Sequence, residues 1–241
     1  MTSRYEYNWP GLTRQYLIDF LWKLYPKLDY ATSAQFHKKF YNHLKSHFPL
    51  IVSKKFYSSL KPGRIHIGGV YYNLADYYKN RPCIEIKFYY PATAAAYKIS
   101  RRQFYRLSKE FADTLLHEII HMRQHRRRNY QALPNYASLA TKKWQRAAQG
   151  YLGNKDEIDA YGFNIACELM DRFGDNEQTI VEHLNSPVKR KYRYDSWSNY
   201  LRAFNYDHNN KIIKRVKQRV IKHISHARRG KPYTVKEWID K

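Results

Sequence analysis

The feature that most constrains this chain is a run from Ser108 to Asn129 that contains neither proline nor glycine. Apolar side chains recur within it at spacings of four, four and three residues, the period of one helical face: Phe111, Leu115, Ile119 and Met122. Ser108 is a favourable N-cap, and Glu110 suits the positive end of a helix dipole. The run therefore predicts a long amphipathic helix from Ser108 to Arg128, half buried in a core.

The same run contains the motif His117-Glu118-Ile119-Ile120-His121. Histidines four residues apart project from one face of a helix, because one turn takes 3.6 residues. Two such imidazoles can bind one Zn²⁺, and the glutamate between them is placed to take a proton from a water on the metal. The motif predicts a zinc hydrolase with His117 and His121 as ligands and Glu118 as general base. The alternative is a helix with two ordinary histidines and a solvated glutamate.

A catalytic zinc takes three protein ligands and leaves one position open. His125 extends the motif, but it lies about 12 Å beyond His117 along a helix that rises about 1.5 Å per residue. No glycine breaks the helix after His121. We therefore expect His125 to lie outside the ligand set, as a supporting, substrate-facing or solvated residue.

A carboxylate further along the chain is the better candidate for the third ligand. A second helical pattern begins where Asn154 or Asp156 can act as its cap. Glu157 shares a flank of this helix with Ala160, whose small side chain lets two helices approach closely. We predict Glu157 as the third zinc ligand and keep Asp159 as the runner-up. The alternative for Glu157 is an acidic residue favoured by the helix dipole alone.

The HExxH motif and the later stretch, Glu157-Ile158-Asp159-Ala160-Tyr161 with Asn164-Ile165-Ala166, resemble the gluzincin group of metallopeptidases. Within that group the chain is similar to ImmA/IrrE-like domains and to small zincin domains encoded by tailed phages. It resembles SprT-like proteases more loosely. The resemblance covers about Arg64 to Arg172 and implies a zincin fold, a Zn²⁺ cofactor and peptide hydrolysis. Many gluzincins carry an aspartate where Tyr161 stands, so we expect Asp113 to take part of its role in orienting an imidazole.

Zincins usually bind substrate along an antiparallel edge strand beside the active helix. The segment Cys83–Tyr90 is a candidate for this strand, because Ile84, Ile86 and Phe88 alternate with other residues between two prolines. We therefore expect a peptide substrate to pair with this segment. The residue that would stabilise the transition state is left open.

The net charge of +24 is the second strong feature of the chain. Residues 186–241 hold 16 Lys and Arg against 4 Asp and Glu, which is half of the excess. Lys211–Arg229 has the pattern of a basic amphipathic helix, in which apolar residues repeat every four positions: Ile212, Val216, Val220 and Ile224. Such a surface attracts nucleic acid or an acidic protein surface. The alternative to the metallopeptidase hypothesis is therefore a catalytically silent zincin-fold protein that binds nucleic acid or forms part of a virion.

The patterns together predict an α+β fold that is mostly helical, with a small antiparallel sheet packed on the HExxH helix. Further elements are expected near these positions: helices at Leu12–Tyr25, Ser33–Phe48, Tyr136–Gln149, around His183 and at Trp197–Phe204, and strands at Arg64–Tyr72 and Cys83–Tyr90. We divide the chain into an N-terminal helical part (1–62), a zincin-like core (63–185) and a basic helical extension (186–241).

The two cysteines, Cys83 and Cys167, lack the spacing of a disulfide framework or a metal site. No apolar run approaches the roughly 18 residues of a membrane span, and the first residues lack the apolar core of a signal peptide. We therefore expect no membrane contact, and residence in the cytoplasm of a bacterium or phage-infected cell or in the phage particle. The oligomeric state is left open.

Overall fold

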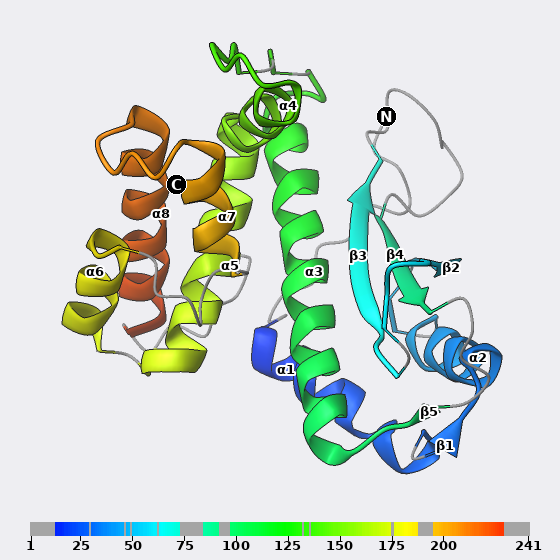
Figure 1. Ribbon diagram of the computed structural model, residues 1–241. Coiled ribbons are helices and arrows are strands. Elements are labelled where there is room, and N and C mark those ends of the chain that lie inside the picture. The colour runs from blue at the N-terminus through cyan, green and yellow to red at the C-terminus, as the bar shows by residue number, and fades with distance from the viewer. Residues whose placement is uncertain are drawn as a thin grey trace. The chain divides into compact units, whose positions relative to one another are not determined.

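The computed structural model describes residues 13–28, 30–45, 47–48, 50–61, 63–72, 84–91, 97–131, 133–134, 136–174, 176–187 and 195–228. This part of the chain forms two compact units that divide between Tyr130 and Gln131. The protein is α+β and mostly helical, as predicted (Figure 1). No helix within the described ranges is long and apolar enough to cross a membrane.

The helices of the first unit, within the described residues, are α1 (Arg14–Trp22), the short 3-10 helix η1 (Tyr25–Lys27), α2 (Ser33–Leu44) and α3 (Arg101–Arg127). The predictions near Leu12–Tyr25 and Ser33–Phe48 are therefore confirmed. Thr32 starts α2 through a reciprocal box, in which its side chain and that of Gln35 each accept from the other's backbone N–H. The Arg14 guanidinium donates to both carboxylate oxygens of Asp113, at 2.5 and 3.0 Å, and so joins α1 to α3.

The long helix α3 begins at Arg101, so the start predicted at Ser108 is wrong. Ser100 and Gln103 form the capping box that starts it, and this box satisfies two backbone N–H groups. Ser108 is fully buried inside the helix, where its hydroxyl donates to the Phe104 carbonyl at 3.0 Å. The predicted end is confirmed, because Arg128 is the C-cap.

The sheet of the first unit has the order β2 (Ile51–Phe56), β4 (Ile84–Tyr90), β3 (His66–Tyr71). Strands β3 and β4 are antiparallel, but β2 and β4 are parallel, so the sheet is mixed and not antiparallel as predicted. The sequence prediction missed β2, whose residues are all partly or fully exposed and therefore show no strong alternation. A separate antiparallel pair joins β1 (Tyr30–Ala31) to β5 (Tyr97–Lys98).

An aromatic core lies between α2, α3 and one face of the sheet. Phe36 and Phe40 of α2 contact Phe88 of β4, with ring centroids 6.2 and 4.9 Å apart. Phe40 also contacts Phe104 of α3, and these four rings are fully buried. Figure 1 shows α3 running alongside β3 for most of the length of the strand. The aromatic core therefore packs both β4 and the HExxH helix against α2.

The second unit is helical: α4 (Lys143–Leu152), α5 (Lys155–Phe173), α6 (Glu177–Asn185), α7 (Ser196–Ala203) and α8 (Lys211–Arg228). Asn154, Asn176 and Asp195 cap the helices that follow them. The helix predicted at Tyr136–Gln149 starts later, at Lys143. Before that residue, the Ser138 hydroxyl donates to Gln149 at 2.6 Å and accepts from the Ala140 N–H, which favours a loop.

Helix α8 packs against α5, and its predicted apolar face is confirmed (Figure 1). The four residues of that face are fully buried: Ile212, Val216, Val220 and Ile224. The two helices approach closely at Gly162, where a Cβ would lie only 2.7 Å from the Cβ of Arg219. The basic helix is therefore part of the core of the second unit.

We predict that Ile212→Ala lowers the free energy of unfolding by about 2–5 kcal/mol, because it leaves a cavity in this core. Lys214→Ala, on the exposed side of the same helix, should change it by no more than about 0.5 kcal/mol. Urea unfolding followed by circular dichroism measures both. Equal losses in the two variants would contradict the assigned orientation of α8.

Candidate metal centre

The two histidines of the motif lie on consecutive turns of α3 in the first unit. His117 is 7% exposed and His121 is 9% exposed. Their Nε2 atoms are 3.0 Å apart, and the rings stand nearly perpendicular, at 76°. Two nitrogens bound to one tetrahedral Zn²⁺ at about 2.0–2.1 Å would be about 3.3 Å apart. The pair therefore has the geometry of two ligands of a single ion.

A glutamine that the sequence analysis overlooked supports this pair. The Oε1 atom of Gln124 lies 3.1 Å from Nδ1 of His121. An amide oxygen only accepts hydrogen bonds, so Nδ1 carries the proton and Nε2 keeps its lone pair. Metal-binding histidines commonly donate their second ring N–H in this way. This contact could have been predicted from the sequence, because residues three positions apart, such as His121 and Gln124, are neighbours on the surface of a helix.

Strand β3 lies directly on α3 at the position of Glu118, which is 7% exposed. A Cβ built on Gly69 would lie 2.6 Å from both Cγ and Oε1 of Glu118, and 2.8 Å from Cγ2 of Thr114. Real Cβ atoms do not approach other atoms so closely. The absence of a side chain at Gly69 therefore allows the strand to lie beside the predicted general base.

The prediction that Cys83–Tyr90 is the substrate strand is wrong. Cys83 lies outside the described residues, and β4, which begins at Ile84, is the central strand, paired with β2 and β3. Alternation identifies a half-buried strand but does not give its place in the sheet. Strand β3 is the one beside α3, and among the described strands its other edge is unpaired.

The outer edge of β3 has a defined pattern of backbone groups. The N–H of Ile67 donates to Oε1 of Glu110 on α3 at 3.0 Å and so points away from β4. Because residues alternate in an antiparallel ladder, Gly69 and Tyr71 also direct their backbone groups to this edge. The Tyr71 ring meets that of His125, with centroids 5.2 Å apart. His125 remains within an unbroken helix, as predicted.

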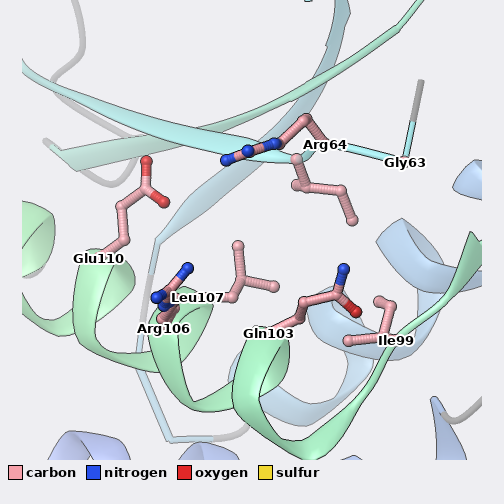
Figure 2. Close-up of a pocket in the computed structure, with 8 residues that line it drawn as sticks. Gly63, Arg64, Ile99, Gln103, Arg106, Leu107 and Glu110 are labelled. Carbon is pink, nitrogen blue, oxygen red and sulfur yellow. The ribbon is translucent and has the colours of Figure 1, made fainter. Parts of the chain in front are cut away.

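A hollow of ≈ 290 Å³ lies where the chain enters β3 beside the first half of α3 (Figure 2). Figure 2 shows Arg64 on the strand side and Arg106 on the helix side, with Leu107 between them and Glu110 at one end. Glu110 pairs with His66, and this hydrogen bond raises the pKa of His66 although burial opposes the shift. The hollow thus has two cationic groups and an acidic group that is already paired.

Asp113 is engaged by Arg14. Its predicted part in orienting an imidazole stays a prediction.

Glu157 lies in the first turn of α5 in the second unit, and Asn154 is the N-cap there. Burial raises the pKa of Tyr151, and its neighbours Tyr161 and Glu157 raise it further. The same neighbours and burial raise the pKa of Tyr200. Tyr151 and Tyr200 therefore lie near enough to Glu157 for its charge to affect them. The role of Glu157 as the third ligand stays a prediction.

The runner-up ligand, Asp159, is placed on another side of α5. Its Oδ1 atom lies 3.4 Å from Nε of Arg219 on α8, within the second unit. The Asp159 carboxylate therefore has a partner on α8, and this ion pair joins α5 to α8.

No protein-family model matches the sequence, and neither a curated protein nor a solved structure matches it.

We predict that Gly69→Ala lowers the free energy of unfolding by about 1–3 kcal/mol, because the added methyl group must displace Glu118, Thr114 or the strand. Gly150→Ala is the matched control. The nearest atom to its new Cβ would be 3.8 Å away, and replacing glycine inside helix α4 should stabilise it by about 0.5–1 kcal/mol.

Shortening the side chain of Glu118 gives a further test of its contact with residue 69. Glu118→Ala introduced together with Gly69→Ala should recover part of the lost stability, measured by the same urea unfolding. If Gly69→Ala is as stable as the wild type, the close approach of β3 to α3 is contradicted.

Proposed function

We propose that the protein is a zinc metallopeptidase of the zincin type, in which His117, His121 and Glu157 bind one Zn²⁺. The observation that carries this proposal is the pair of buried Nε2 atoms 3.0 Å apart, with Glu118 beneath an edge strand of the sheet. Imidazole nitrogens with a carboxylate oxygen form a common ligand set of hydrolytic zinc sites.

The metal, when bound, would polarise the substrate carbonyl and lower the pKa of a water molecule. Glu118 then accepts the proton of that water and delivers it to the leaving amine. Its burial against Gly69 holds the carboxylate in place. The outward backbone groups of Gly69 and Tyr71 bind the substrate as an additional strand.

The edge of β3 also favours one class of peptide. A substrate strand paired with Gly69 would reach the hollow between Arg64 and Arg106 after about five residues, because a strand rises about 3.3 Å per residue. Two guanidinium groups bind carboxylates well. We therefore expect a preference for substrates with an acidic group on this side of the cleaved bond.

We assign the third ligand position to Glu157 and not to Asp159. The neighbouring Tyr151 supports this choice, because oxygen ligands of zinc are commonly held by polar groups beside them. Asp159 is engaged by Arg219.

Metal analysis of purified protein tests the ligand set. We predict one equivalent of zinc in the wild type and its loss in His117→Ala, His121→Ala and Glu157→Gln. Asp159→Asn is the matched control on the same helix and should retain the metal. Full zinc in any of the first three variants would show that the ligand set is wrong.

Catalysis is tested separately with Glu118→Gln. This variant should keep its zinc but lose about 10²–10⁴-fold in the rate of peptide hydrolysis, because the general base is removed. A quenched fluorescent peptide library gives the rate. Zinc-loaded wild-type protein that cleaves no peptide would instead favour the silent zincin-fold protein.

A further inference from the structure

The exposed side of α8 in the second unit is strongly basic. Because its apolar residues are buried against the rest of the unit, the other faces of the helix carry its cations. Lys214, Arg215 and Lys222 are exposed, and Lys211 is exposed at its start. At about 1.5 Å per residue, this row of positive charge spans roughly 16 Å.

A hollow of ≈ 490 Å³ lies between this face and the start of α5. Its lining includes four cationic residues: Lys155, Arg215, Arg219 and Lys222. Ile158 and Gln218 complete the lining, which contains no acidic and no aromatic residue among those the structure describes. Asp159 pairs with Arg219 at 3.4 Å and offsets one of these charges.

Like charges that meet at one hollow repel one another, and an anion bound among them relieves the repulsion. The site is thus arranged for a ligand with several negative charges along its length.

We propose that this hollow and the exposed face of α8 bind the sugar–phosphate backbone of a double-stranded nucleic acid. A nucleic acid is favoured by the net charge of +24 and by guanidinium groups, which match phosphate oxygens in geometry. A duplex is favoured over a single strand because the lining offers no aromatic ring on which a base could stack. Binding is therefore independent of sequence and driven by the release of counterions. This site is separate from the proposed peptidase chemistry and does not depend on it.

Fluorescence anisotropy of the full chain with a labelled DNA duplex of about 20 base pairs tests the proposal. The logarithm of the binding constant should fall linearly with the logarithm of the salt concentration. Two duplexes of different sequence should bind with the same affinity. The double variant Arg215→Ala/Lys222→Ala should reduce the slope by about 2 and weaken binding about 60-fold near 100 mM salt. Arg219 is left unchanged because it pairs with Asp159.

The control variant Lys38→Ala/Arg102→Ala removes the same charge from exposed positions of the first unit. It should leave the slope nearly unchanged. Equal effects of the two double variants would overturn the assigned site and indicate attraction by net charge alone. Polyglutamate that competes as well as the duplex would also overturn the proposal, in favour of an acidic protein partner. Unfolding curves verify that each variant is folded.

Discussion

Strand β3 can lie on helix α3 at Glu118 because residue 69 has no side chain. This contact brings β3, whose second edge has no partner among the described strands, to the helix that carries His117 and His121. A side chain at that position would displace Glu118, Thr114 or the strand itself. The capping box at Ser100 fixes the start of α3, and the contact between Phe40 and Phe104 packs α3 against α2.

The same contact explains why polar groups are buried here. Two imidazoles and a carboxylate lie within consecutive turns of one helix and are each less than a tenth exposed. Burial of such groups lowers the stability of a fold unless they have partners, and here the two Nε2 atoms lie within hydrogen-bond distance of each other. Gln124 accepts from one nitrogen of His121, and a bound cation would replace the contact between the two Nε2 atoms. Stability and the proposed chemistry therefore favour the same arrangement.

The sequence alone predicted what depends on local periodicity. The HExxH helix, the Glu157 helix and the buried stripe of α8 follow from the spacing of apolar residues, and all three helices form. Sequence patterns do not report contacts between distant segments. The place of β4 in the centre of the sheet, the parallel pairing of β2 and the contact at Gly69 all depend on such contacts. The misplaced start of α3 has another cause, because Ser108 and Ser100 are both acceptable caps and only Ser100 has a glutamine three residues later.

Zinc K-edge X-ray absorption of the purified, metal-loaded protein tests the central claim most directly. A centre built by His117, His121 and Glu157 should show only nitrogen and oxygen neighbours at about 2.0–2.1 Å, with the outer-shell scattering of two imidazole rings. A sulfur neighbour at about 2.3 Å, or the signal of fewer than two imidazoles, would contradict it.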